Sequence, residues 1–166
     1  MRFIVNVQGD EPLIRPLYVE RCLAALRATP DADWATLIYP LTGEHDAANP
    51  NLVKVVCDQA GGALYFSRAA IPFERDARGA ARRYGHIGLY VYRADALRRF
   101  AALPPSPLEQ TEKLEQLRAL EAGMSILCVE VPRAFPGIDT PEDLAQAEAL
   151  LAADPTLANI VPSHGN

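Results

Sequence analysis

The sequence predicts an α/β protein in which helices cover a sheet. Short β-rich runs alternate with helical patterns along the chain, the first run has apolar character on both faces, and turn residues separate the segments. Of the 166 residues, 49% are apolar and 22% charged, which is typical of a globular protein. The length corresponds to about one domain. We assign residues 1–153 to that domain and 154–166 to a loose C-terminal tail.

The first three elements follow from periodicity. Phe3–Val7 is predicted to be a strand covered on both sides, because apolar residues occupy both of its faces. Such a strand belongs in the middle of a sheet, so we expect this chain to begin partway through a fold. A helix is expected at Pro16–Ala28, where apolar residues recur at helical spacing after a proline in the first turn. Trp34–Leu41 is predicted to be a second strand.

The middle of the chain predicts a hairpin and a further strand. Leu52–Cys57 and Ala63–Phe66 are β-rich runs, and Asp58–Gly62 between them has the residues of a hairpin turn. Arg75–Gly85 is rich in arginine, glycine and alanine and is predicted to be a mobile loop. The strand at His86–Tyr92 should place alternate residues in the core.

The last part of the chain predicts three helices and one strand. A short helix is expected at Ala94–Leu103, and a longer one from Ser106 to about Gly123. The longer helix opens with a capping box and a proline at its first position. A strand at Ser125–Val131 and a last helix at Thr140–Ala153 complete the pattern.

Charge and cysteine usage exclude several classes of protein. The net charge of −5 argues against a nucleic-acid partner. Cys22, Cys57 and Cys128 form no C-x-x-C motif, and we interpret them as reduced thiols of a cytosolic protein. No apolar run approaches the length of a membrane helix, and no signal peptide is visible. We therefore predict a cytoplasmic location without membrane contact.

Two carboxylates at strand ends are candidates for a metal site. Asp10 follows the first strand, and Asp139 lies between the last strand and the last helix. Ligands collect at the carboxyl ends of strands in open α/β sheets, and a pair of carboxylates with room for waters suits Mg²⁺. A turn carboxylate is the alternative for Asp10, and a helix-entry carboxylate is the alternative for Asp139.

The long predicted helix carries a third carboxylate of interest. Glu115 shares one helical face with small or apolar residues such as Leu108 and Ala119. A carboxylate within such a face needs a partner or a polar cavity. The leucines at 114, 117 and 120 define a competing apolar face, which would leave the glutamates in water.

Other polar candidates are a histidine and two arginines. His86 lies on the polar and aromatic face of its predicted strand, where it is either a site residue or a structural histidine. Arg68 and Arg75 could hold a carboxylate in their planar forks, or serve only solubility. The phosphate-binding motifs GxxxxGK[ST] and GxGxxG are absent from the sequence.

Seven segments in order carry a resemblance to a known family. They are NVQGDEP (6–12), NPNLVKVV (49–56), ALYFSRA (63–69), HIGLYVYR (86–93), SPLE (106–109), EKLEQLR (112–118) and GIDTPEDL (137–144). Over residues 3 to about 150 the chain resembles the 3-deoxy-manno-octulosonate cytidylyltransferases, or CMP-Kdo synthetases. Members transfer CMP from CTP to the acid sugar Kdo, which gives CMP-Kdo and pyrophosphate for lipopolysaccharide biosynthesis.

The resemblance implies a fold, a site and partners. The fold would be the three-layer αβα nucleotidyltransferase fold, which is Rossmann-like and glycosyltransferase-A-like, with a mixed sheet. Asp10 and Asp139 would bind Mg²⁺, and a homodimer is expected. The residues that match the family's Kdo pocket are Gln8, Arg68, Arg75, His86, Tyr90, Glu115 and Gln116.

The chain departs from the family at its beginning. Family members start with a strand and a loop of the type PARxxSxRLPGKP, which holds the CTP phosphates, and this segment is not in the sequence. We therefore expect an N-terminally truncated copy of the fold, with the acid-sugar and metal half retained. A synthetase for a related acid sugar ranks lower, because the sugar pocket matches as well. The alternative to an enzyme is a non-catalytic remnant that binds acid sugar or dimerises.

Overall fold

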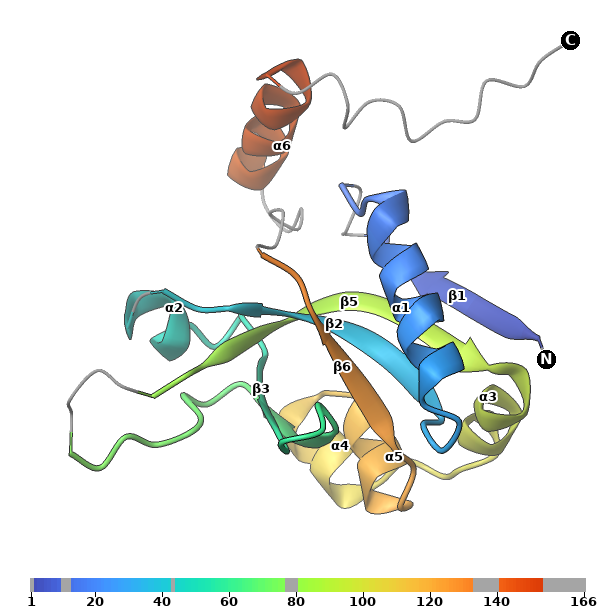
Figure 1. The fold of residues 1–166 in the computed structure, drawn as a ribbon. Helices are drawn as coiled ribbons and strands as arrows, with labels where there is room; N and C mark the ends of the chain where they lie inside the picture. The colour runs from blue at the N-terminus through green and yellow to red at the C-terminus, as the bar shows by residue number, and fades with distance from the viewer. Residues whose placement is uncertain (1, 10–12, 43, 77–80, 133–140, 154–166) are drawn as a thin grey trace, which may run out of the picture.

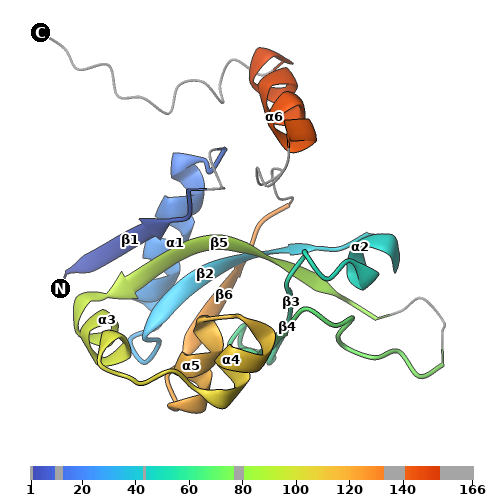
Figure 2. The same ribbon diagram turned by 180° about the vertical axis from the view of Figure 1, so that it is seen from behind.

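The computed structural model describes residues 2–9, 13–42, 44–76, 81–132 and 141–153. Within them, a six-stranded sheet lies between two layers of helices, and Figures 1 and 2 show α1 on one side and α4 and α5 on the other. The main strand order is β4-β3-β5-β2-β6, and β1 pairs with β5. Only the β2–β6 pair is parallel, so the sheet is mixed. The predicted α/β class is confirmed.

The strands have the following bounds: β1 Phe3–Val7, β2 Trp34–Pro40, β3 Lys54–Cys57, β4 Ala63–Ser67, β5 Tyr84–Arg93 and β6 Ile126–Glu130. The long strand β5 organises the sheet, because β2 runs along one of its edges. The other edge is shared: β3 pairs with the start of β5, and β1 with its second half. Between them, the backbone N–H of His86 donates to the carbonyl of Val53 (2.8 Å), and that of Gln8 to the carbonyl of Gly88 (3.2 Å).

The helices have the following bounds: α1 Pro16–Ala28, α2 Glu44–Ala48, α3 Ala94–Ala101, α4 Pro107–Glu112, α5 Gln116–Glu121 and α6 Pro141–Ala153. The one-turn helix α2 was not predicted, because five residues are too few to show apolar periodicity. None of the helices among the described residues is long and apolar enough to cross a membrane.

Strand alternation divides the core into two clusters. In β2, Ala35 and Leu37 point to the α1 side, and Trp34 and Ile38 to the α5 side. Residues 87, 89 and 91 of β5 are at most 2% exposed on the α1 side, as the sequence predicts. The even-numbered residues of β5 therefore line the face covered by α3 and α5. All the site residues predicted on β5 lie on that second face.

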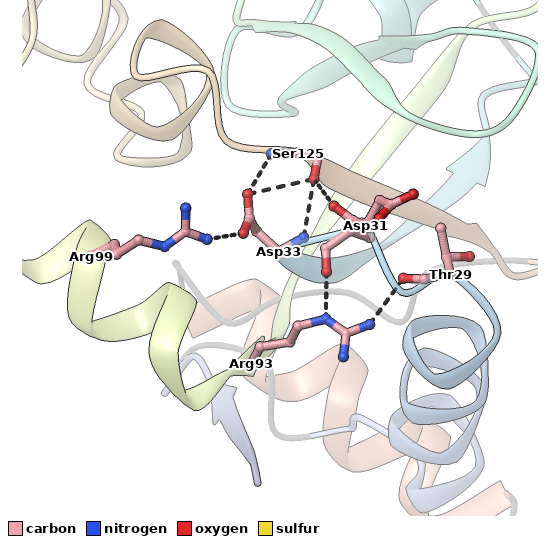
Figure 3. A network of polar contacts seen from close by, with 7 residues as sticks. Thr29, Asp31, Asp33, Arg93, Arg99 and Ser125 are labelled. Carbon is pink, nitrogen blue, oxygen red and sulfur yellow. Dashed lines mark hydrogen bonds and ion pairs between the residues drawn. The ribbon is translucent and has the colours of Figure 1, made fainter. Parts of the chain in front are cut away.

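A buried arginine fixes one end of the α1 layer. Arg93, at the end of β5, is 5% exposed and donates from Nε to the carbonyl of Ala32 (2.7 Å). Its Nη2 donates to the carbonyls of Leu26 (2.6 Å) and Thr29 (2.9 Å). These carbonyls lie at the C-terminal end of α1 and in the turn that follows, where backbone oxygens lack helical partners. Arg93 therefore caps the helix and ties it to β5 (Figure 3).

The carboxylate of Asp33 connects the start of β2 to the start of β6 and to α3. Asp33 accepts a hydrogen bond from the backbone N–H of Ser125 (2.9 Å) and pairs with Arg99 of α3. The Ser125 hydroxyl in turn donates to the carbonyl of Asp31 (2.8 Å). The starts of β2 and β6 are thus held in register beside α3, as Figure 3 shows.

The first strand differs from its prediction. β1 is present with the predicted bounds, but Ile4, Val5 and Val7 are 38%, 41% and 46% exposed. Within the described residues, β1 pairs with β5 alone. The prediction of a strand covered on both sides is therefore wrong for this chain. Apolar residues on both faces of a strand indicate surfaces that are favourable to bury. They do not show which segment packs against those surfaces.

The predicted helix from 106 to 123 is two helices. α4 ends at Glu112, Lys113 adopts the left-handed conformation (φ 57°), and α5 begins at Gln116. The predicted helical face that joined Glu115 to Leu108 therefore does not exist. Leu114 and Leu117 are buried (6% and 0% exposed), so the competing apolar face is the one that packs.

Candidate functional site

His86 is held on the second face of β5 by a buried threonine. The Thr36 hydroxyl lies 2.8 Å from His86 Nε2 and donates to the carbonyl of Leu89 (2.8 Å). A hydroxyl has one proton to donate. When Thr36 gives that proton to Leu89, the Nε2–H tautomer of His86 donates to Thr36 and Nδ1 remains an acceptor. Burial lowers the pKa of His86 to about 4, so the ring is neutral at physiological pH.

Thr36 is a site residue that the sequence prediction missed. The β2–β5 register shifts between Thr36 and Leu37, which is a β-bulge beside His86 and Tyr90. Bulges re-aim side chains and are frequent next to active sites. The signal in the sequence is a polar residue inside the apolar run Trp34–Tyr39, because a fully buried hydroxyl needs partners.

Aromatic rings surround His86 and complete this surface. The His86 ring centroid lies 5.2 Å from that of Phe66, edge to face, and 5.4 Å from that of Tyr90. Tyr90 stacks on Tyr92 at 5.9 Å. Burial raises the pKa of both tyrosines, and to about 12 for Tyr92. Both phenols therefore stay protonated at physiological pH; the Tyr92 phenol is buried and bonds to Asn6, and Tyr90 can donate a hydrogen bond to a ligand.

The break between α4 and α5 brings a carboxylate to these rings. Glu115 immediately precedes α5, its side chain is exposed, and its negative charge contributes to raising the pKa of Tyr90 and Tyr92. Gln116 follows it and is 5% exposed. The structure therefore brings Glu115 to the His86 and Tyr90 face, although the helical argument that singled out Glu115 was wrong.

Arg68 is anchored at the edge of this face. Its Nε donates to the carbonyl of Glu112 (2.9 Å), and its Nη1 donates to the carbonyl of Pro50 (3.0 Å). The Glu112 carboxylate accepts from the hydroxyl of Ser67 (2.6 Å) and from the backbone N–H of Arg68 (3.0 Å). These contacts use Nε and Nη1, so Nη2 is the nitrogen that can face a ligand.

A buried lysine supports the same anchor and was also missed. Lys54 is 0% exposed, and its Nζ donates to the carbonyls of Asn49 (2.7 Å), Leu52 (2.6 Å) and Arg68 (2.6 Å). A charged group is buried only when its donors are satisfied. The signal in the sequence is a single lysine inside the apolar run Leu52–Cys57.

The other residues predicted for the site have fewer contacts with the His86 face. Gln8 is exposed directly after β1, and its backbone N–H donates to the carbonyl of Gly88 on β5 (3.2 Å). Arg75 is exposed, and none of the polar contacts among the described residues joins it to His86, Tyr90 or Glu115. Asp10 and Asp139 lie outside the described residues. Within the described part of the chain, no group of three or more His, Cys, Asp or Glu could hold a metal ion.

The arrangement suits recognition of a polar, hydroxyl-rich ligand. A neutral imidazole, the Tyr90 phenol and an amide offer donors and acceptors, and Glu115 can accept hydrogen bonds from hydroxyls. A cavity of about 590 Å³ lies elsewhere, and none of the predicted site residues lines it. The chemistry of the side chains, rather than the size of that cavity, therefore locates the candidate site on the second face of β5.

Comparison with known proteins agrees with this fold. The model of the cytidylyltransferase family matches residues 1–126. The chain belongs to the cytidylyltransferase family.

Particular relatives narrow the comparison. The 3-deoxy-manno-octulosonate cytidylyltransferase of Chlorobium limicola is 49% identical over 149 residues, which cover 89% of this chain and 60% of the relative. That of Syntrophotalea carbinolica is 51% identical over 158 residues, covering 90% and 63%. The structure of CMP:2-keto-3-deoxy-manno-octonic acid synthetase complexed with CTP superposes with a TM-score of 0.85 at 45% identity, covering 91% of this chain and 62% of that one. The chain thus spans about three fifths of the length of these relatives.

Proposed function

We propose that the protein to which this chain belongs transfers CMP from CTP to 3-deoxy-D-manno-octulosonate (Kdo), giving CMP-Kdo and pyrophosphate. The observation that carries the proposal is the convergence of His86, Tyr90 and Glu115 on one face of β5, in a chain about 50% identical to proteins named for this reaction. The named substrate of those relatives is an acid sugar with several hydroxyls, which fits the neutral donors and the single carboxylate of this face.

In the proposed reaction, the anomeric hydroxyl of Kdo attacks the α-phosphorus of CTP. A P–O bond forms to the sugar oxygen, the bond to the β-phosphate oxygen breaks, pyrophosphate leaves, and the hydroxyl proton is released. The chain's part is to hold the sugar, because phosphoryl transfer depends mainly on positioning and charge stabilisation. His86 Nδ1 would accept a hydrogen bond from a sugar hydroxyl, Tyr90 would donate one, and Gln116 would complete the set.

The carboxylate of the sugar requires cationic partners. We assign this role to Arg68, through Nη2, and to Arg75, because guanidinium forks match carboxylates. Gln8, at the end of β1, would lie beside the sugar. Glu115 would accept hydrogen bonds from sugar hydroxyls away from the acid group.

Magnesium is the proposed metal, with Asp10 and Asp139 as its ligands. What supports it is the chemistry of two carboxylates in sequence positions just after β1 and just before α6. When bound, Mg²⁺ would offset negative charge on the nucleotide phosphates. A homodimer, a cytoplasmic location and a place in lipopolysaccharide assembly belong to the same proposal, and they rest on the resemblance alone.

The test is an assay of CMP-Kdo formation from CTP and Kdo with Mg²⁺. It is run on residues 1–166 and on the same chain preceded by the phosphate-loop segment of a relative. A triphosphate needs cationic or N–H partners, so we expect turnover from the longer protein and negligible turnover from residues 1–166. Kdo binding by both proteins without turnover in either would favour the alternative, a remnant that only binds acid sugar.

Arg75→Ala tests the sugar assignment in the active protein. We expect the KM for Kdo to rise at least 10-fold while the KM for CTP changes less than 2-fold, because a bidentate charged contact contributes on the order of 1.5–3 kcal/mol. Steady-state kinetics with each substrate varied in turn gives both values. Arg98→Ala, at an exposed position of α3, is the matched control and should change neither KM. Equal loss for both substrates would remove Arg75 from the sugar site.

A further inference from the structure

Cys57 of β3 and Cys128 of β6 lie where the turn of the β3–β4 hairpin contacts β6. The turn of the β3–β4 hairpin reaches β6, because Gly62 forms an antiparallel bridge with Leu127. The backbone N–H of Cys128 donates to the carbonyl of Gly61 (2.8 Å). Cys57 is the last residue of β3, directly before this turn, so it is brought beside Cys128.

The two cysteines open to the same cavity. Both residues line the cavity of about 590 Å³, and each thiol shifts the pKa of the other. Cys128 is 8% exposed, and Cys57 is partly exposed. The cavity lies on the same side of the sheet as the candidate site but shares none of its predicted residues. A small reagent in the cavity would therefore meet both sulfurs.

The surroundings make the two thiols unequal. Donation from the Cys128 thiol lowers the pKa of Cys57, and the same hydrogen bond together with burial raises the pKa of Cys128. Asp58 opposes the change at Cys57, and its charge also raises the pKa of Cys128. Cys57 is thus the thiol that ionises first, and the thiolate is the reactive form.

The third cysteine offers an internal comparison. Cys22 is 0% exposed within the cluster beneath α1, on the opposite side of the sheet. Burial raises its pKa to about 12, so it is not a nucleophile at neutral pH.

We propose that Cys57 and Cys128 are a thiol pair that hydroperoxides oxidise to an intramolecular disulfide. The Cys57 thiolate attacks a peroxide oxygen, the O–O bond breaks, and Cys57 becomes a sulfenic acid while the other oxygen leaves as hydroxide and is protonated. The Cys128 sulfur then attacks the Cys57 sulfur, so that the S–S bond forms and the S–O bond breaks. With hydrogen peroxide, two thiols and one peroxide give one disulfide and two waters, and a dithiol reductant reverses the change.

The disulfide would fasten the β3–β4 hairpin to β6. The far end of that hairpin carries Ser67 and Arg68, which bind Glu112 at the edge of the candidate site. A metal site is disfavoured, because the described residues supply no third ligand that could join the two thiols. The proposal is independent of the function proposed above, since it needs neither substrate.

The experiment titrates the purified protein with hydrogen peroxide and counts thiols. After unfolding and alkylation, intact mass should show the free thiols falling from three to one, and dithiothreitol should restore all three. Peptide mapping under non-reducing conditions should recover the Cys57 and Cys128 peptides joined in a monomer. Because mapping uses the unaltered chain, the outcome does not depend on whether a variant folds.

Two variants sharpen the result. Cys22→Ser should lose the same two thiols as the parent protein, because it leaves the pair intact. Cys128→Ser should stop at a Cys57 sulfenic acid, which dimedone traps. Three free thiols persisting at peroxide levels that oxidise Cys128→Ser would overturn the proposal. A disulfide that includes Cys22, or one formed only between two chains, would also overturn it.

Discussion

At the scale of single residues, two buried polar side chains near the candidate site have their hydrogen-bonding groups satisfied. Thr36 uses its hydroxyl between His86 and a backbone carbonyl, and Lys54 uses its ammonium group on three carbonyls. Such groups are costly to bury alone and strongly position-specific when satisfied.

The depressed pKa of His86 predicts a pH dependence of stability. The unfolded chain protonates His86 near pH 6.5, and the folded chain near pH 4. Between these values the unfolded state binds more protons, so the free energy of unfolding falls as pH drops from 6.5 to 4. The fall is up to about 3 kcal/mol. Well above pH 6.5 neither state is protonated and the effect vanishes.

Urea unfolding at several pH values measures this effect against His86→Gln. Glutamine does not titrate, so the difference between the two curves isolates His86 from the carboxylates. We expect the difference to be constant well above pH 6.5 and to change steadily from about pH 6.5 down to about pH 4. Parallel curves throughout would show that His86 has the same pKa in both states.

Lys54→Met should destabilise the protein by about 2–4 kcal/mol, because three partly buried carbonyls lose their donor while the apolar stem is kept. Urea unfolding gives the value. Lys113→Met makes the same replacement at an exposed lysine and should change the free energy of unfolding by less than about 0.5 kcal/mol. Similar values for both variants would mean that the Lys54 hydrogen bonds add nothing to stability.

At the scale of elements, the break between α4 and α5 decides where the carboxylates point. The capping signal at the start of α4 is real, because the Glu109 carboxylate accepts from the backbone N–H of Ser106 (3.1 Å). Glu109 also pairs with Arg118 of α5 (2.5 Å), which fastens the two short helices together. The left-handed conformation at Lys113 ends α4, so Glu115 does not lie on the continuous helical face that the sequence suggests.

Lys113→Gly should stabilise the protein by about 0.5–1 kcal/mol. A left-handed residue with a Cβ costs roughly 1–2 kcal/mol, and glycine avoids that cost but loses more entropy on folding. Lys113→Val should be destabilising, because a β-branched residue resists this conformation further. Urea midpoints of the three proteins test the order Gly, Lys, Val. A valine variant as stable as the parent would contradict it.

At the scale of the whole molecule, the sheet is covered on both faces but exposes the edge strand β1. Its residues Ile4, Val5 and Val7 are each more than a third exposed. Apolar edge strands pair readily with other chains. We therefore expect β1 to promote self-association of this 166-residue chain in concentrated solution.

Val7→Lys should reduce self-association of the chain, because a charge on an edge strand opposes pairing. Light scattering over a concentration series measures the mass. Leu17→Lys is the matched control, since Leu17 is 50% exposed on helix α1, away from any strand edge. Equal effects of the two substitutions would assign the association to general hydrophobicity instead of β1.

Most of the elements could be predicted from the order of the residues. The bounds of β1 and α1, the hairpin of β3 and β4, and the buried side of β5 were predictable because local periodicity and turn residues encode them. The order of seven segments also predicted the family. His86 and Tyr90 could be placed on one face, because alternation along a strand is a local property.

The contacts between elements are determined only by packing of segments that are distant in the sequence. No local pattern showed that Thr36 would meet His86 across a bulge, that Lys54 would bind carbonyls from two segments, or that Cys57 would meet Cys128. The break at Lys113 and the exposure of β1 were missed for the same reason. Each depends on which distant surface packs against a segment, and that free energy is not written in the periodicity of the segment itself.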